Sequence, residues 1–291
     1  MTLSGIAPAK VNLSLAVTGR RADGYHTLES LVVFAGFGDR LEVAPHEALV
    51  LEVDGPFARG VPVDGRNLVL KAAHLLQERT GCRKGARITL TKTLPHGGGI
   101  GGGSSDAALA LKLLAELWDV PPLSAGEALA LGADVPVCMQ APQPQIMRGI
   151  GELLVPAPVL PDSWLVLVNP QIETPTGAMF RALARETGPT PAPVLHVPLG
   201  MGHEDFALWL AAHGNDFADV LTDVQGPEHM PQIALILEAL SLQPGCLMQN
   251  LSGSGSTCWG LFATRTQAET AAEMLANKNA GWWVQPAQML S

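Results

Sequence analysis

The chain has 291 residues, of which 47% are hydrophobic and 15% are charged. This balance is typical of a globular protein and excludes extensive disorder, and the length is enough for about two domains. The net charge of −9 argues against a surface that tracks nucleic acid, because such a surface needs clusters of Lys and Arg.

The cysteines and the N-terminal residues indicate the cellular compartment in which the protein is expected. The four cysteines, at positions 82, 138, 246 and 258, form no CxxC pair, so neither a zinc site nor a disulfide framework is predicted. The first residues lack a basic region followed by an apolar run, and no stretch approaches the ~20 apolar residues that cross a bilayer. We therefore expect a cytoplasmic protein with no targeting segment and no membrane contact.

The first half of the chain is expected to begin with strands and to continue with helices. Residues 6–17, 26–37 and 39–53 are rich in Val and Leu and are separated by turn residues, which predicts three strands. The pattern then predicts, in order, a helix over 67–81, a strand over 86–92 and helices over 104–118 and 124–132. Ser124 and Glu127 have the spacing of a capping box at the start of the last helix.

The second half is expected to mix strands and helices without a regular alternation. A proline-rich stretch over 141–161 places the domain boundary near residue 155, which divides the chain into domains 1–155 and 156–291. Predicted strands cover 164–168, 245–251, 257–263 and the C-terminal end, and predicted helices cover 176–185, 203–213, 231–241 and 266–277. A second proline-rich stretch, 188–200, is expected to form a surface loop. This order predicts two α+β domains.

A glycine run directly before a predicted helix indicates an anion site. Six of the seven residues 97–103 are glycine, and glycine lets backbone N–H groups wrap a phosphate at the positive end of the helix. A P-loop is excluded because Ser104 stands where that motif needs Lys, and a dinucleotide fingerprint on these glycines is weak. A flexible loop is the less favoured structural alternative. The candidate residues are Pro95, His96, Gly97, Gly98, Gly99, Ile100, Gly101, Gly102, Gly103, Ser104 and Ser105.

Lys10 and Asn12 lie on one face of the first predicted strand, opposite the apolar face that contains Ala9 and Val11. Solvent exposure is the ordinary explanation for a lysine on such a face. The small, uncharged neighbours instead favour a ligand that lies close to the strand. Asp134, in "LGADVPVC", follows the predicted end of a helix and precedes a proline, so it is either a turn or cap residue or a base.

Two further stretches contain candidate binding residues. Tyr25 and His26 follow an Asp-Gly turn, and an aromatic pair there provides either a stacking surface or an ordinary packed strand edge. Gly253 and Ser254, in "NLSGSGSTCW", lie either in a hairpin turn or in a second loop that closes on phosphate.

Taken together, "PAKVNLSL", "RADGYHTLES", "PHGGGIGGGSSDAA", "LGADVPV" and "LSGSGS", in this order, resemble the GHMP kinase superfamily over nearly the whole chain. The resemblance implies a two-domain α+β fold. Its N-terminal domain would have a left-handed βαβ unit and its C-terminal domain would be ferredoxin-like, with the active site between them. It also implies an ATP-dependent small-molecule kinase whose acceptor is a cytidine-diphosphate-linked polyol, phosphorylated on the 2-hydroxyl of its methylerythritol moiety in the non-mevalonate isoprenoid pathway.

The resemblance also implies roles for individual residues. Asp134 falls on the general base and Lys10 on the catalytic lysine, and residues 95–105 fall on the ATP loop with Mg²⁺ on the phosphates. The metal ligands and the oligomeric state have no assignment. Substrate-binding positions are Asn12, Tyr25, His26, Thr176, Phe180, Gly253 and Ser254, with Tyr25 and Phe180 on either side of the cytosine and His26 at its edge. His96 departs from the apolar residue that the family often has before the glycines.

Two alternatives remain open from the sequence. One is a GHMP kinase with another acceptor, such as homoserine or mevalonate, and the aromatic pair at 25–26 speaks against it. The other is a nucleotide-binding protein that has lost catalysis, and the presence of both Lys10 and Asp134 speaks against that.

Overall fold

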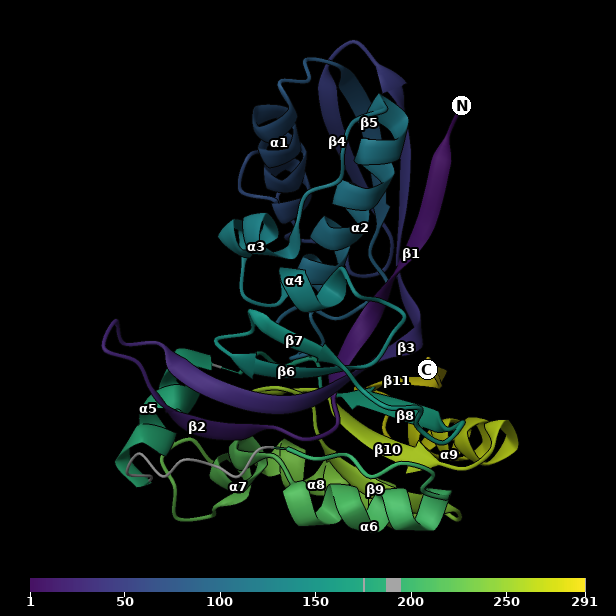
Figure 1. The fold of residues 1–291 in the computed structure, drawn as a ribbon. Helices are drawn as coiled ribbons and strands as arrows, with labels where there is room; N and C mark the ends of the chain where they lie inside the picture. Colours follow the sequence, from purple (N-terminus) through teal and green to yellow (C-terminus); the bar gives the residue numbers. More distant parts are fainter. Residues whose placement is uncertain (175, 187–194, 291) are drawn as a thin grey trace. The chain divides into compact units, whose positions relative to one another are not determined.

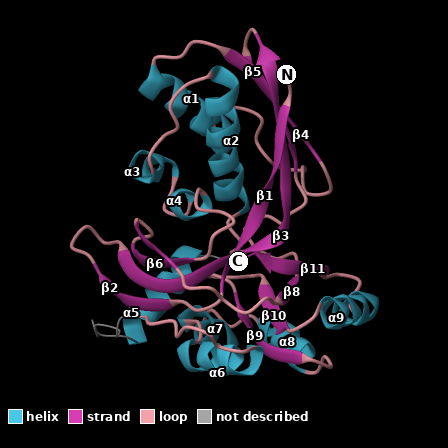
Figure 2. Cartoon of the chain, turned by 45° about the vertical axis from the view of Figure 1, so that its right-hand side comes forward, coloured by secondary structure: helices cyan, strands magenta, loops and turns pink. Residues whose placement is uncertain are grey.

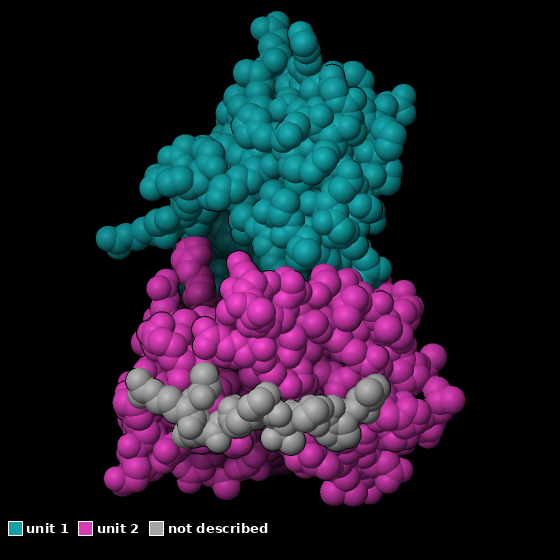
Figure 3. Space-filling model, turned by 60° about the vertical axis from the view of Figure 1, so that its left-hand side comes forward, with its two compact units in different colours: residues 1–10, 37–95, 101–141 teal, residues 11–36, 96–100, 142–291 magenta. Residues whose placement is uncertain are grey.

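A computed structural model describes residues 1–174, 176–186 and 195–290 (Figure 1). The chain forms two compact units (Figure 3). Unit 1 contains residues 1–10, 37–95 and 101–141, and unit 2 contains residues 11–36, 96–100 and 142–291. Strands β1 (Leu3–Asn12) and β3 (His26–His46) therefore each contribute residues to both units. The units interleave along the chain, and the boundary near residue 155 stays a prediction.

A βαβ element forms one part of unit 1. Strands β4 (Leu49–Asp54) and β5 (Gly85–Thr91) are parallel neighbours joined through helix α1 (Leu68–Thr80), and β5 also pairs antiparallel with residues 40–46 of β3. The Asn67 side chain caps the start of α1 by accepting from Val69 N, and Gly81 ends the helix at φ 70°. The helix predicted over 67–81 is thus confirmed, while the left hand of the crossover stays a prediction.

Helix α2 (Gly102–Trp118) packs against α1 in unit 1. It begins two residues before the predicted start, because its first turn is built from glycines that a propensity-based prediction leaves out. The helix predicted over 124–132 is shorter than expected. It consists of α3 (Ala125–Ala128) followed by a 3₁₀ turn, η1 (Leu129–Leu131), and the predicted capping box of Ser124 and Glu127 is present.

Antiparallel strands that neighbour one another form the centre of unit 2 (Figure 2). Their spatial order is β11 (Trp283–Leu290), β8 (Trp164–Asn169), β10 (Cys258–Phe262) and β9 (Cys246–Leu251), and the end of β11 also pairs antiparallel with residues 34–35 of β3. Among the described residues, the helices between β8 and β9 are α5 (Thr176–Glu186), α6 (His203–His213), α7 (Asp216–Thr222) and α8 (Pro231–Ser241), and α9 (Arg265–Lys278) lies between β10 and β11. This is the βαββαβ chain order of a ferredoxin-like fold.

The apolar core of unit 2 lies between this sheet and its helices. Helices α8 and α9 pack on the strands, and Phe217, Ile236 and Phe262 are among the buried residues that join them. Residues 26–32 of β3 form a second antiparallel group with β2 (Ala16–Arg20) and β6 (Gln145–Gly149), and β7 (Leu153–Pro156) pairs with β6. Leu28 of β3 packs against this core, which thus supports the strand that carries the candidate residue His26.

Several predicted elements differ from the structure. The strand predicted over 6–17 is divided between β1 and β2, and those predicted over 26–37 and 39–53 become the long strand β3 and the short strand β4. Gly38 separates the two predicted strands but lies inside β3. Glycine is required there because a Cβ would come 1.9 Å from Ala7 O. The prediction missed α4 (Val135–Cys138), β6, β7 and α7, which contain or follow prolines or are very short.

No helix among the described residues combines the length and the apolar character needed to cross a membrane. All four cysteines are free thiols, as the sequence predicts. Of the proline-rich stretch 188–200, residues 188–194 lie outside the described residues, while Leu195 and Val197 are buried.

Candidate active site

Lys10 and Asp134, 124 residues apart in the sequence, meet in unit 1. Lys10 Nζ donates to Asp134 Oδ2 at 2.8 Å, with side chains 5% and 37% exposed, respectively. Asp134 is at the N-cap position of α4, yet its side chain makes no capping hydrogen bond. The carboxylate is therefore paired with the lysine rather than used to begin a helix, and it stays accessible to a ligand.

Gly101 lies directly against Lys10. A Cβ at this position would come 3.1 Å from Lys10 Cβ and 3.3 Å from its Cε. The residue also has φ 64°, a left-handed conformation that glycine adopts at little cost. The last part of the glycine run therefore places backbone next to the Lys10–Asp134 pair.

The start of α2 offers backbone donors at the same place. Its N-cap is Gly101, and no side chain caps the helix. The N–H groups of the first turn have no partner within an α-helix, and the helix dipole makes this end positive. The region around Gly102 and Gly103 is therefore suited to bind an anion.

Gly97 and Gly99, in the part of the loop that belongs to unit 2, also have positive φ values, of 59° and 70°. A second loop of unit 2, residues 252–257, holds this segment in place. Ser252 Oγ donates to Gly99 O at 3.0 Å, and Thr257 N donates to Gly98 O at 3.0 Å. A side chain at 99 would clash with Ser252 O at 2.3 Å, so the close approach of the two loops needs glycine.

Asn12 is held in unit 2 by several hydrogen bonds. Its Nδ2 donates to Ser30 Oγ at 2.7 Å, its backbone N donates to Ser252 Oγ at 3.1 Å, and its backbone O accepts from Trp259 Nε1 at 3.1 Å. Its Oδ1 is buried and has no hydrogen-bond partner among the described residues. The amide is thus oriented with its nitrogen satisfied and its oxygen left as the acceptor.

The predicted cytidine-binding residues fall into two groups in unit 2. His26 stacks on Phe180 of α5, with ring centroids 4.8 Å apart and planes at 18°, and Phe180 meets Phe217 edge-on at 4.9 Å. Tyr25 is 62% exposed on the preceding turn. Burial, and then the charge of Arg20, lower the pKa of His26 below its ordinary value of 6.5. The structure thus brings His26 and Phe180 together, with Tyr25 at the surface nearby in the chain.

Thr176 and the second glycine loop also meet. Thr176 Oγ1 and Ser254 Oγ are 2.9 Å apart and share a hydrogen bond. Gly253 has φ 57°, and a Cβ there would come 3.0 Å from Gly99 O and 3.4 Å from Asn12 Oδ1. Gly253 therefore lies close to Asn12 and Gly99, and Ser254 lies close to Thr176. Four predicted substrate residues from three separate stretches of sequence are thus grouped in unit 2.

The sequence reasoning missed several polar residues beside the glycine run. A Cβ on Gly97 would come 3.1 Å from Glu173 Cγ, so this exposed carboxylate is adjacent to the loop. In unit 1, Lys92 forms ion pairs with Asp39 and Asp106. No local motif distinguishes these residues, although "SSD" at 104–106 contains one of them at the start of a helix.

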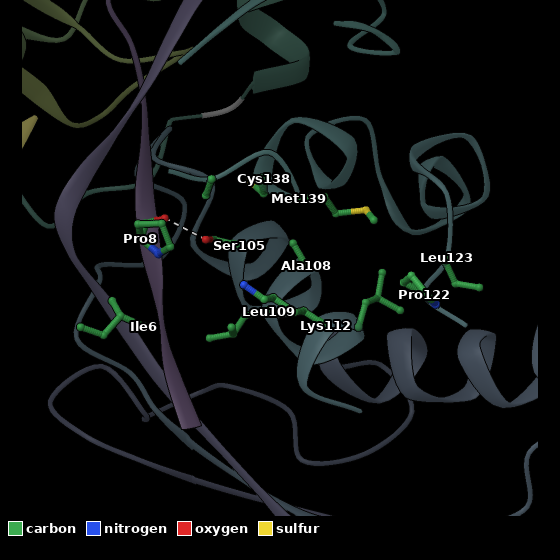
Figure 4. A pocket seen from close by; sticks show the side chains of 12 residues that line it. Ile6, Pro8, Ser105, Ala108, Leu109, Lys112, Pro122, Leu123, Cys138 and Met139 are labelled. Atoms are coloured by element: carbon green, nitrogen blue, oxygen red, sulfur yellow. Dashed lines mark hydrogen bonds between the residues drawn. The ribbon is translucent and has the colours of Figure 1, made fainter. Parts of the chain in front are cut away.

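A pocket of about 300 Å³ lies beside α2 in unit 1 (Figure 4). Residues of β1, α2 and α4 line it, and most of them are apolar. Ser105 Oγ donates to Pro8 O at 2.8 Å at its wall, and Ser105 N donates to Gly101 O. The Ser105 hydroxyl is therefore engaged with β1, whereas the glycine backbone before it is the part available to an anion.

Comparisons with known proteins show what this chain is similar to. The family model of the GHMP kinases N-terminal domain matches residues 67–144, and that of the GHMP kinases C-terminal domain matches residues 202–281. The 4-diphosphocytidyl-2-C-methyl-D-erythritol kinase of Jannaschia sp. (strain CCS1) is 52% identical over 290 residues, which are 99% of this chain and 98% of the relative. The protein of the same name from Paramagnetospirillum magneticum is 50% identical, with 98% of each chain covered.

A solved structure gives the same result at the level of the fold. The crystal structure of a 4-(cytidine 5'-diphospho)-2C-methyl-D-erythritol kinase has a TM-score of 0.79 and is 32% identical, and the match covers 99% of this chain and all of the other. The likeness therefore extends over both matched family domains.

Proposed function

The chain belongs to the GHMP kinases and, within them, to the 4-diphosphocytidyl-2-C-methyl-D-erythritol kinases, and from this membership we propose how its residues transfer a phosphoryl group. The enzyme is an ATP-dependent phosphotransferase of the methylerythritol pathway to isoprenoid precursors. The acceptor atom proposed here is the 2-hydroxyl of the methylerythritol moiety. The observation that carries the proposal is the 2.8 Å contact between Lys10 Nζ and Asp134 Oδ2.

Asp134 is the proposed general base. Lys10 occupies Oδ2, which leaves Oδ1 of the partly exposed carboxylate to accept the proton of the substrate hydroxyl. As the proton leaves, the developing alkoxide is negative, and the buried ammonium group of Lys10 offsets that charge. A positioned base of this kind contributes about 10²–10⁴-fold to the rate, and phosphoryl transfer otherwise depends on positioning and electrostatics.

The glycine loop is the proposed cradle for the ATP phosphates. The uncapped N–H groups at the start of α2 would donate to phosphate oxygens at the positive end of the helix. Gly101 touches both this end and Lys10, so a phosphate bound there would lie beside the proposed base. The hydrogen bonds from Ser252 and Thr257 to the loop carbonyls support the segment 98–99 in unit 2.

The cytidyl end of the substrate is the proposed ligand of Tyr25, His26 and Phe180. Burial lowers the pKa of His26, so its imidazole is neutral near pH 7 and keeps one nitrogen as an acceptor. That acceptor suits the exocyclic amino group of cytosine. Asn12 Oδ1, with Nδ2 fixed by Ser30, is the proposed acceptor for a hydroxyl of the polyol.

Among the described carboxylates near the loop, those of Asp134, Asp39 and Asp106 are each paired with a lysine. Asp134 is paired with Lys10, and Asp39 and Asp106 are paired with Lys92. In the part of the chain that the structure describes, no three His, Cys, Asp or Glu side chains are grouped for a metal. Magnesium bound to the phosphates would neutralise part of their charge.

The acceptor is tested by measuring ADP release with one candidate at a time. We expect turnover with 4-diphosphocytidyl-2-C-methyl-D-erythritol and at most background release with homoserine or mevalonate. Selective turnover of homoserine or mevalonate would refute the proposed acceptor. ATP binding without ADP release with any of the three would instead support a protein that has lost catalysis.

A further inference from the structure

Three charged side chains are buried together in unit 1, beside the start of α2. Lys92 Nζ donates to Asp106 Oδ2 at 2.8 Å and also to a carboxylate oxygen of Asp39. None of the three side chains is more than 6% exposed. Most ion pairs on this chain lie at the surface, where they contribute little, whereas removing one partner of a buried pair leaves an uncompensated charge.

This cluster is attached to both ends of the glycine run. Asp39 Oδ1 accepts from Leu94 N at 2.9 Å and from Thr93 N at 2.5 Å, immediately before the run. Asp106 is the fifth residue of α2, immediately after the run. A Cβ on Gly102 would come 3.5 Å from Lys92 Nζ and 3.6 Å from Asp39 Oδ2, so the cluster lies directly against the loop backbone.

The charges of the cluster do not balance. It contains two carboxyl groups and one ammonium group, and Asp106 Oδ1 is buried with no hydrogen-bond partner in the part of the chain that the structure describes. Burial raises the pKa of Asp106 to about 7, although Lys92 opposes that rise. A single Asp would be enough to pair with Lys92. The second buried carboxyl group therefore lowers the stability of the fold, so stability does not explain its presence.

We propose that Asp106 is a positioning residue for the nucleotide, which with Lys92 and Asp39 holds the glycine run in its phosphate-binding conformation. This inference rests on the nucleotide site proposed above. Asp106 acts on the loop through Lys92 and Asp39, and its own side chain touches neither substrate. The three side chains fix Thr93 and Leu94 relative to the first turn of α2, so the backbone donors need no rearrangement when phosphate binds.

The test removes the carboxyl group with Asp106→Ala in the full-length enzyme. We expect the KM for ATP to rise roughly tenfold, the size of a lost hydrogen bond to a charged group, while kcat changes by less than about threefold. Glu269→Ala is the matched control, because it makes the same change in an exposed pair with Arg265.

A second variant keeps the test decisive if Asp106→Ala folds poorly. Asp39→Asn removes the other carboxylate from Lys92 but retains the Oδ1 acceptor for Leu94 N, and we expect the same selective rise in the KM for ATP. An unchanged KM for ATP in both variants would overturn the positioning role. So would a loss of active enzyme that lowers kcat and leaves both KM values as they were. If the wild-type enzyme itself showed no saturation with ATP, the nucleotide site would be the hypothesis that failed.

Discussion

The Lys10–Asp134 pair is unevenly exposed, and this has a consequence for catalysis. The lysine side chain is 5% exposed and fixed against Gly101, whereas the aspartate side chain is 37% exposed. The cation is therefore part of the rigid interior, and the carboxylate is the side from which a hydroxyl can approach. A buried lysine without this partner would leave an unpaired charge, so the two residues depend on each other.

Replacing Asp134 with Asn is the direct test of the base. We expect kcat to fall by about 10²–10⁴-fold, because the amide cannot accept the hydroxyl proton, while the KM for ATP stays within about threefold of the wild type. Initial rates of ADP release measure both quantities. Asp64→Asn, in an exposed pair with Arg66, is the control. Wild-type kcat in Asp134→Asn would assign the base to another group.

The titration of His26 is a second prediction for a single residue. Because burial and Arg20 lower its pKa, we expect the midpoint of its NMR titration to lie below 6.5. In the window just below pH 6.5 the unfolded chain takes up a proton that folded His26 does not, so the free energy of unfolding falls as the pH falls there. Phe180→Leu removes the stacked ring. It should move the midpoint back toward 6.5, and an unchanged midpoint would show that Phe180 contributes nothing.

At the scale of elements, the sequence predicts best the helices whose ends carry local signals. Helices α6 and α8 begin and end at the predicted residues. Helix α1 lies between its two predicted end residues, the N-cap Asn67 and the C-cap Gly81. Strands β6 and β7 were missed because the prolines around them read as a linker, although Pro156 only ends β7. Proline at a strand end or in the first turn of a helix costs little, so its presence alone does not exclude either element.

The candidate site shows a similar limit. The glycine run could be selected from the sequence by its local pattern, whereas Lys10 and Asp134 were assigned roles through the family resemblance, and the distances between all of them depend on tertiary packing. Asp39 and Lys92 have no such pattern, since a charged residue beside a strand end ordinarily faces solvent. Only the fold shows that they are buried with Asp106.

The left-handed turn at Gly101 provides a test of the loop as an element. Gly101→Ala introduces a Cβ 3.1 Å from Lys10 Cβ at φ 64°, so we expect it to lower stability by about 1–2 kcal/mol and also to lower kcat more than tenfold. Gly81→Ala is the matched control, because Gly81 has φ 70° and open space around its Cα. Thermal unfolding and ADP release separate the two effects. Equal loss of kcat in both variants would mean that strain alone explains it.

At the scale of the whole molecule, the net charge of −9 opposes the approach of anionic substrates. Exposed charges farther apart than the Debye length, about 10 Å at 0.1 M salt, are screened from each other, whereas contacts within the site are not. We therefore expect kcat/KM for ATP to increase as KCl is raised from 0.01 to about 0.1 M. A steady decrease over this range would show that local cations, rather than the net charge, govern the encounter. Glycerol at matched viscosity is the control for diffusion.

The interleaving of the two units along the chain bears on how such an enzyme can evolve. Each unit is assembled from three separate segments, so any single crossover between two related genes divides at least one of them. A crossover after residue 141 would keep unit 1 whole, but would separate residues 11–36, with Asn12 and His26, from the Phe180 and Ser252 that they contact. Acceptor preference in this architecture is therefore expected to diverge by stepwise substitution within one gene, because recombination cannot exchange the acceptor-binding unit as a module.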